Sequence, residues 1–296
     1  MGATELRAAA ATMPRAWFAV TDGAHFDDLP ALLDRAGLRG HPLYLEAGDP
    51  AGVRAGPYLL SLADQREIAV LIELAADKPA LAFWSWPGPL ETLRRHLRGL
   101  NLCEIPNENR AGPDDPEYET VLFRHWDPNV LAVTLPVLTP EQQSRFLGDS
   151  AGVVFDATEH GGVIIAPRPD PLPPQPVGML RFEPEQVAGM TSGRILASHR
   201  RIASYVREAA PEQTARTDDR VLLDAIGRYD HEARELGLAK ESDIARWSFL
   251  QVISGGDLFT DVHVREVFNA DDTPLGPTER MDALMEAVGD GLGAGA

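Results

Sequence analysis

The sequence predicts an α/β N-terminal lobe, a mixed sheet with flanking helices, joined by a Pro-rich linker to a small all-α C-terminal lobe. Six prolines stand between Ala166 and Gly178. Because proline lacks a backbone donor and fixes φ, this stretch is neither helix nor central strand. Strand-like and helix-like segments alternate before it, whereas apolar residues recur with helical spacing after it. We therefore expect an α/β domain over 14–165, a linker over 166–178 and a helical lobe over 179–290. The length of 296 residues also favours two domains.

Runs of β-branched and aromatic residues predict the strands of the first lobe. The first run is closed by the turn signal Asp22-Gly23, and the last ends at Asp127-Pro128. A polar loop over 107–119 precedes this last run. The expected strands are residues 16–23, 42–48, 56–62, 80–86, 101–106 and 119–127.

Helices are expected between these strands. The segment 25–37 has acidic residues near its start and a glycine at its end. Leucines at helical spacing predict a helix over 89–100, with Arg and His on the opposite side. The segment Thr139-Pro140-Glu141-Gln142 is a helix start, and Gly148 ends that helix. Residues 66–77 are apolar on every face, which fits a mostly buried helix or a longer strand.

The second lobe is expected to be helical almost throughout. Its first helix carries Ile195, Ile202 and Val206 on one face. The second begins with two capping aspartates and ends at Gly237. The expected helices are residues 194–210, 218–237, 242–253 and 277–288. The linker before them should be an extended spacer of polyproline type, or else a docking site for a proline-recognising partner.

Charge and cysteine content narrow the classes of partner. The formal net charge is −18 and the isoelectric point is near 4.8, so the surface repels nucleic-acid phosphates and anionic lipid. No apolar run approaches the roughly 20 residues that span a bilayer, and the weakly apolar N-terminus does not resemble a signal peptide. The single cysteine, Cys103, forms no internal disulfide. We expect a cytoplasmic protein that binds neither nucleic acid nor membrane.

Most of the common catalytic and cofactor motifs are absent from the sequence. It has no phosphate-binding loop, HExxH, CxxC pair or dinucleotide loop, and no two histidines four residues apart. The spacing GxSxG occurs at 148–152, but there it follows the predicted helix that ends at Gly148, so it is not the strand-to-helix elbow of a nucleophilic serine. We therefore expect no catalytic residues, no metal and no cofactor. His125 and Asp127 would lie on the same side of a strand. They fit a ligand pair, a base with its orienting carboxylate, or a structural hydrogen bond.

Two side-chain clusters are candidates for partner contact. The run 83–87 contains two tryptophans, which fits a binding platform or a strand with one side chain buried and the next at an interface. Arginines also cluster on one helix of this acidic chain. They fit a solvated face paired with Glu208, or a contact for an acidic partner. These arginines are Arg194, Arg200, Arg201 and Arg207.

Several pieces of the first lobe occur in an order that forms a family pattern. The most telling piece is residues 123–131, Phe-Arg-His-Trp-Asp-Pro-Asn-Val-Leu. The other pieces are Asp22-Gly23, Leu43-Tyr44, residues 56–62, Ser85, residues 93–98, Leu135-Pro136 and residues 142–148. Over residues 14–150 the chain resembles the effector-adaptor family of bacterial type VI secretion systems, known as Tap or TEC chaperones. His125 stands where the family usually has an aromatic residue, and Asn129 where it usually has Arg.

The resemblance implies a cytoplasmic, non-enzymatic adaptor. Such a protein binds a toxic type VI effector and helps mount it on the VgrG spike. The family usually has Arg at the position of Asn129. If that Arg contacts cargo in relatives, this chain has lost the contact or has moved it to another residue. Two alternatives remain, namely a hydrolase that uses His125 and Asp127, and an immunity or structural partner protein.

Nine residues are candidates for partner binding. Arg124 and Asp127 flank a predicted strand end before a proline, where a buried Arg–carboxylate bond would fix a corner of the fold. Direct contact with cargo is the other interpretation of this pair. The full set is Asp22, Tyr58, Trp84, Trp86, Arg124, Trp126, Asp127, Arg194 and Arg201.

Overall fold

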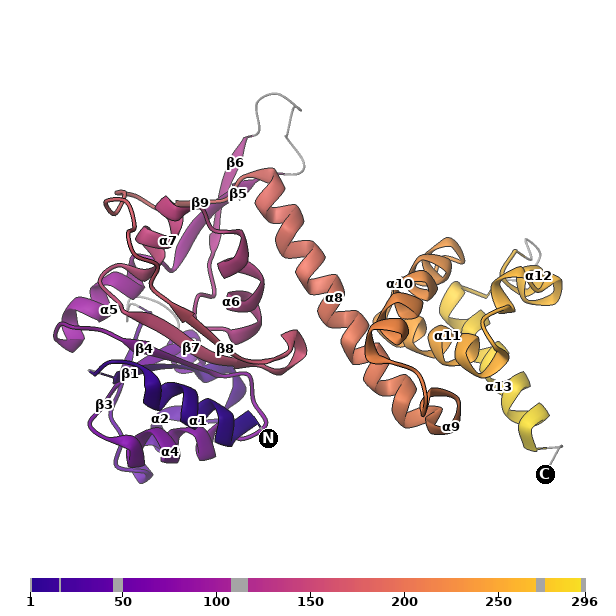
Figure 1. The fold of residues 1–296 in the computed structure, drawn as a ribbon, viewed down its shortest axis with the longest axis horizontal. Coiled ribbons are helices and arrows are strands. Elements are labelled where there is room, and N and C mark those ends of the chain that lie inside the picture. The colour runs from indigo at the N-terminus through magenta and orange to yellow at the C-terminus, as the bar shows by residue number, and fades with distance from the viewer. Residues whose placement is uncertain (1, 16, 45–49, 108–116, 270–274, 294–296) are drawn as a thin grey trace. The chain divides into compact units, whose positions relative to one another are not determined.

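The computed structural model describes residues 2–15, 17–44, 50–107, 117–269 and 275–293 (Figure 1). It divides into two compact units, Met1–Arg194 and Ile195–Ala296, and each is described by itself. The first unit is an α/β structure and the second is helical, which confirms the predicted fold class.

A six-stranded antiparallel sheet forms the centre of the first unit. Its order is β2-β3-β1-β4-β7-β8, so the first strand in sequence lies in the middle of the sheet. In the register, Phe18 lies between Ser61 on one neighbour and Trp84 on the other. The strands are β1 (Trp17–Asp22), β2 (Gly40–Pro42), β3 (Pro57–Leu62), β4 (Leu81–Ser85), β7 (Gly152–Ala157) and β8 (Gly162–Pro167). Three expected strands correspond to β1, β3 and β4, whereas β7 and β8 were not expected.

A second, three-stranded sheet has the order β6-β5-β9. Its strands are β5 (Leu102–Pro106), β6 (Tyr118–Leu122) and β9 (Leu180–Arg181). The β5–β9 pair is parallel and every other strand pair of the described residues is antiparallel, so this small sheet is the mixed one. The expected loop over 107–119 joins β5 to β6, and its residues 108–116 lie outside the described residues.

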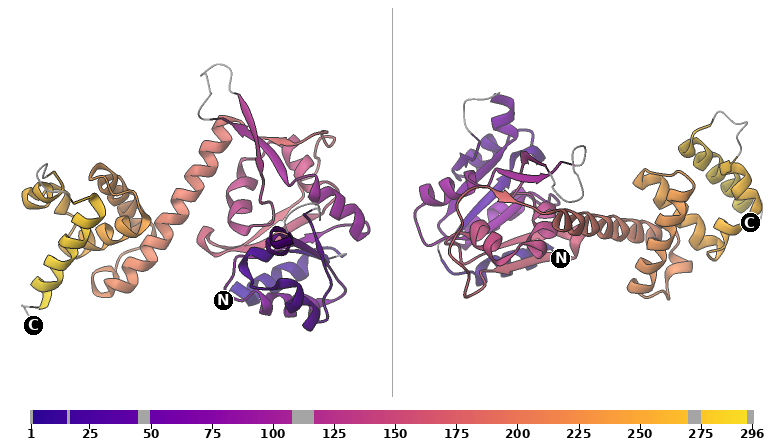
Figure 2. Two further views of the ribbon diagram at one scale, coloured as in Figure 1. Left: turned by 180° about the vertical axis from the view of Figure 1, so that it is seen from behind. Right: turned by 90° about the horizontal axis from the view of Figure 1, so that it is seen from above.

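Helices cover both faces of the six-stranded sheet (Figures 1 and 2). Because side chains alternate along a strand, Trp17 and Ala19 face one core while Phe18 and Val20 face the other. The first core is covered by α1 (Gly2–Thr12), α2 (Leu29–Arg35) and α4 (Gln65–Leu74). The second core is covered by α5 (Leu90–Arg98), α6 (Pro128–Thr134) and α7 (Pro140–Leu147). A short helix, α3 (Pro50–Ala55), precedes β3.

Most helix ends follow from local signals. Thr139 and Gln142 form the predicted capping box, in which each side chain accepts from the other residue's backbone N–H. Helix α7 ends before Gly148, whose φ of +55° favours glycine. The Asp64 carboxylate accepts from two backbone amides at the start of α4. This cap decides that the ambiguous segment 66–77 begins as a helix.

The strand expected over 119–127 is wrong at its end. Strand β6 stops at Leu122, and Asp127 caps α6 by accepting from the backbone N–H of Asn129 (2.9 Å). Pro128 occupies the first position of that helix, where its missing N–H costs nothing. The strand expected over 42–48 is also shifted, since β2 ends at Pro42 and residues 45–49 lie outside the described residues.

The Pro-rich segment packs against the first unit, whereas we expect it to separate two lobes. The Ser144 hydroxyl donates to the carbonyl of Pro173 (2.7 Å), and Arg145 donates to the carbonyl of Gly178 (2.8 Å). The chain then returns to the second core, where Leu180 and Phe182 are buried. The division between the units therefore falls beyond this segment, at Arg194 within α8 (Pro184–Ala209).

The second unit packs its helices around Trp247 and Ile226, both fully buried. Besides the end of α8 it contains α9 (Pro211–Thr214), α10 (Asp219–Glu235), α11 (Glu241–Ser254), α12 (Val262–Asn269) and α13 (Pro277–Gly293). Ile202 and Val206 are buried as expected, but Ile195 is 42% exposed. None of the described helices combines the length and hydropathy needed to cross a bilayer.

Candidate partner-binding surface

Three charged residues from separate elements meet in what we call the arginine corner: Asp22, Arg124 and Asp127. Asp22 ends β1, Arg124 lies between β6 and α6, and Asp127 is the cap of α6. An Nη2 atom of Arg124 lies 2.7 Å from Asp22 Oδ2 and 3.3 Å from Asp127 Oδ2. The second oxygen of each carboxylate accepts a backbone N–H, from Ala24 and Asn129 respectively. The corner thus ties the end of a central strand to the start of a helix.

The corner is buried on one side and open on the other. The side chain of Asp22 is 2% exposed, whereas that of Arg124 is 43% exposed. Burial acts to lower the pKa of Arg124, but the hydrogen bond to Asp22 and the charges of Asp127 and Asp22 outweigh it and raise the pKa. Arg124 therefore stays charged, and its open side faces solvent.

Removing the arginine is expected to cost more stability than removing its second carboxylate. Arg124→Gln leaves the buried Asp22 carboxylate without its strongest partner, and we expect the free energy of unfolding to fall by about 1–2 kcal/mol. Asp127→Asn keeps a residue that caps helices well. We therefore expect it to lower the free energy of unfolding by only a few tenths of the loss in Arg124→Gln. Urea unfolding at neutral pH measures both. Equal costs for the two variants would contradict the role of Arg124 as the partner of Asp22.

The four aromatic candidates are buried, so they do not form an exposed binding platform. Trp84, Trp86 and Trp126 belong to the second core, and Tyr58 to the first core on the opposite face of the sheet. Trp86 donates to the Thr92 hydroxyl (2.9 Å). The strand interpretation of 83–87 fits in part: residues 81–85 form β4, but all five are buried and none is left at an interface.

His125 and Asp127 do not form a strand-borne pair. Both lie beyond the end of β6, and Asp127 is used by the α6 cap and by Arg124. His125 is completely buried, and its Nε2 lies 3.1 Å from the Asn101 side-chain oxygen. Burial, with a smaller effect of the charge on His96, lowers the pKa of His125 to about 3. Its ring is therefore neutral at neutral pH.

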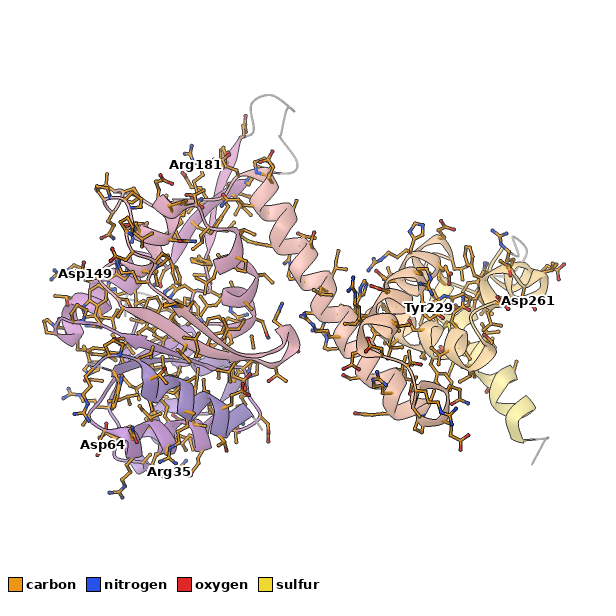
Figure 3. All side chains as sticks on the ribbon, in the orientation of Figure 1. Arg35, Asp64, Asp149, Arg181, Tyr229 and Asp261 are labelled. Carbon is orange, nitrogen blue, oxygen red and sulfur yellow. The ribbon has the colours of Figure 1, made fainter. Side chains whose placement is uncertain are left out.

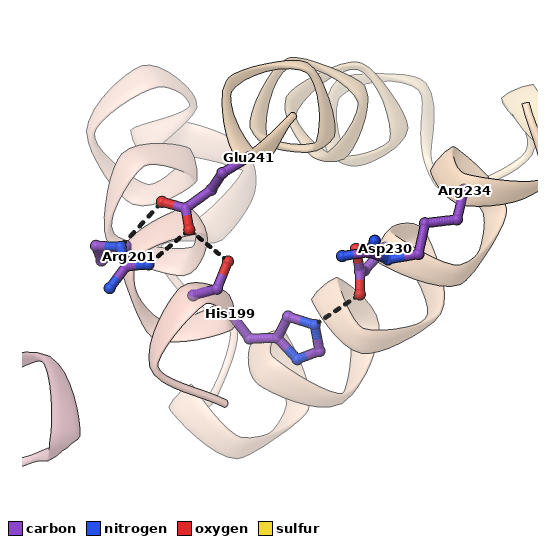
Figure 4. A network of polar contacts seen from close by, with 6 residues as sticks. His199, Arg201, Asp230, Arg234 and Glu241 are labelled. Atoms are coloured by element: carbon purple, nitrogen blue, oxygen red, sulfur yellow. Dashed lines mark hydrogen bonds and ion pairs between the residues drawn. The ribbon is translucent and has the colours of Figure 1, made fainter. Parts of the chain in front are cut away.

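The two candidate arginines on α8 lie on either side of the division between the units. Arg194 donates to the Thr191 hydroxyl (3.2 Å). Arg201 donates to both oxygens of Glu241, which also accepts from Ser198 (Figure 4). This ion pair fits the interpretation of the arginines as a solvated, paired face. The partner of Arg201 is Glu241 of α11, however, and not the expected Glu208. Within the described residues, no group of His, Cys, Asp and Glu side chains is placed to hold a metal ion.

An open groove of about 690 Å³ lies beside α5, and we call it the α5 groove. It is bordered by α5, by residues 43–44 after β2, and by the β5–β6 pair. The basic residues on the outer side of 89–100 were predicted from the sequence, but this groove was not. Its border includes the side chains of Tyr44, Arg94, Arg95, Arg98, Leu102 and Leu122.

Residues 17–145 match the model of a protein family described as a domain of unknown function, DUF4123. The chain matches no curated protein and no solved structure. The matched residues run from β1 into α7, so they include the whole arginine corner and every residue that borders the α5 groove.

Proposed function

We propose that this chain is a cytoplasmic adaptor that binds a type VI secretion effector and helps load it onto the VgrG spike, without catalysis. The observation that carries the proposal is the match of residues 17–145 to DUF4123, a domain known in type VI secretion effector adaptors. The order of motifs that resembles this adaptor family lies over the same part of the chain.

The positions of His125 and Asp127 in the fold favour a binding protein over a hydrolase that uses these two residues. A general base needs a pKa near the working pH and access to its substrate. His125 is fully buried with a pKa lowered to about 3, and Asp127 already holds a helix start and an arginine. Neither group is available for chemistry at the surface.

The proposal predicts that effector and spike genes lie beside this one, and it is tested with the proteins that those genes would encode. We expect the tagged chain to co-purify with that effector when the two are co-expressed. Deletion of the gene should abolish secretion of that effector while other effectors are still secreted. Failure of the pure chain to bind either the effector or VgrG, together with unchanged secretion in the deletion strain, would overturn the proposal.

Two control measurements separate the alternatives. His125→Gln should load effector like the wild type once its folding is confirmed, whereas a hydrolase would lose turnover. The chain expressed alone with the toxin should not protect cells, because protection is the property of an immunity protein.

A further inference from the structure

We propose that the α5 groove binds a segment of the effector polypeptide in which carboxylates stand beside apolar side chains. The inference rests on the proposed function and adds to it a place and a chemistry of recognition. The two walls of the groove differ in character, and its floor is fixed to the core.

One wall is basic in a chain that is otherwise strongly acidic. Of the described residues that border the groove, three are arginines of α5 and one, Glu91, is acidic, while the chain as a whole has a net charge of −18. Arg94 is already engaged, since it donates to the carbonyl of Pro42 (3.3 and 3.2 Å). Within the described residues, neither Arg95 nor Arg98 has an ion pair.

Two arginines that have no ion pair among the described residues of such an acidic chain favour an external acidic partner. The chain has 18 more acidic than basic residues, so carboxylates are abundant as internal partners for Arg95 and Arg98. On α8, Arg201 and Arg207 do form such internal ion pairs. Guanidinium groups bind carboxylates through two parallel hydrogen bonds, so two neighbouring arginines suit a peptide with spaced acidic residues.

The other wall is apolar and exposed. Leu102 of β5 and Leu122 of β6 lie directly opposite each other in the register, and they are 47% and 51% exposed. A partner that covers both leucines removes their remaining exposed apolar surface from water, which favours binding. This wall favours a polypeptide over a nucleic acid, whose phosphates the net charge also repels at long range.

The floor of the groove is fixed to the core, so the site needs little ordering before it binds. Asn101 donates to the carbonyl of Leu43 (3.3 Å) and its side-chain oxygen lies against His125. The ring of Tyr44 packs edge-on against Trp126, with ring centres 5.6 Å apart. Preorganisation of this kind raises affinity because less entropy is lost on binding.

Short labelled peptides test the inference by fluorescence anisotropy with the full chain. The first probe alternates Glu and Leu, the second has Lys in place of Glu, and the third has Ser in place of Leu. A labelled single-stranded oligonucleotide is the fourth probe. We expect the Glu–Leu peptide to bind most tightly, and its affinity to fall as salt is added.

Charge reversal at the groove should weaken this binding. Arg95→Glu/Arg98→Glu is expected to lower the affinity for the Glu–Leu peptide at least about tenfold. Arg95→Gln/Arg98→Gln should have a smaller effect, and Leu122→Ser should weaken binding about threefold or more. The matched control is Arg35→Glu/Arg66→Glu, on exposed residues of α2 and α4, the helices that cover the other face of the sheet. Figure 3 labels Arg35. Thermal unfolding confirms that each variant is folded.

Several results would overturn the inference. These are equal weakening by the control variant, tighter binding of the oligonucleotide, or peptide affinity unchanged by Arg95→Glu/Arg98→Glu. An effector that binds this variant as tightly as the wild type would overturn the groove as its site, while the adaptor function would stand. If the wild type binds the Glu–Leu peptide through the groove but binds no effector, the proposed function fails and the peptide site remains.

Discussion

The wild-type first unit is expected to lose stability as the pH falls below 6.5, and His125→Gln should lose distinctly less. The full difference, reached near pH 3, amounts to roughly 4–5 kcal/mol. The variant will be less stable at neutral pH because His125 packs against Trp126 and Phe123. The informative quantity is therefore the slope of unfolding free energy against pH, measured by urea unfolding at several pH values.

Stability falls with falling pH because the buried ring of His125 does not take up a proton in the folded state. In the unfolded chain the histidine takes up a proton near pH 6.5, whereas in the folded chain burial and the charge on His96 lower its pKa to about 3. Between these values the unfolded state binds more protons, so acid favours unfolding. Above pH 6.5 both states are neutral at this residue and its contribution to stability is fully present.

A matched control separates this site from the other histidines. His231 is exposed on α10 of the second unit, so His231→Gln changes no contact of the first unit and should leave the unfolding of that unit as in the wild type. His96, whose pKa burial also lowers, should give His125→Gln a residual slope of the same sign. A wild-type slope that survives unchanged in His125→Gln would show that the buried ring takes up its proton without unfolding.

The fold was predictable where local chemistry and burial agree. The strand β4 is apolar from Leu81 to Trp84, and the capping box at Thr139 marks a helix start by sequence alone. The same kind of signal was misinterpreted at Asp127-Pro128, which ends a strand in one context and begins a helix in another. Strands β7 and β8 have β-branched residues on both sides of Gly161-Gly162, so a signal for this hairpin was present in the sequence.

The domain boundary was harder because composition does not show where a segment packs. Prolines exclude regular structure from 166–178, but they do not exclude a segment that lies on the surface of a folded unit. Whether it does so depends on long-range partners such as Ser144 and Arg145. The return of Phe182 to the core is likewise a tertiary event that no local pattern encodes.

Some residues of the candidate site were also predictable from the sequence, and others were not. The corner residues Asp22, Arg124 and Asp127 were named from the sequence, and the structure brings them together. The tryptophans were named for a property that serves core and interface equally, so the sequence alone did not separate these roles. The α5 groove depends on three segments that are far apart in the chain, and no periodicity relates them.

Replacing Trp84 by alanine is expected to lower the unfolding free energy by roughly 3–5 kcal/mol, the usual cost of a large cavity in a core. Trp84 is completely buried in β4, between β1 and β7, and its ring packs against Phe146 with ring centres 5.3 Å apart. Urea unfolding of the purified chain measures the loss. The free energy of unfolding of a domain is about 5–15 kcal/mol, so this variant loses a large part of its stability.

The phenylalanine variant distinguishes a core residue from a partner anchor. Trp84 Nε1 has no hydrogen-bond partner in the described part of the chain, so Trp84→Phe loses volume but no polar contact and should cost only about 1–2 kcal/mol. Effector binding should then follow the folded fraction in both variants. Full stability combined with lost effector binding in Trp84→Phe would instead require the ring to leave the core and contact the partner directly. Because Trp84 is completely buried, the proposed effector binding is expected to use groups that remain exposed, such as the arginines and leucines of the α5 groove.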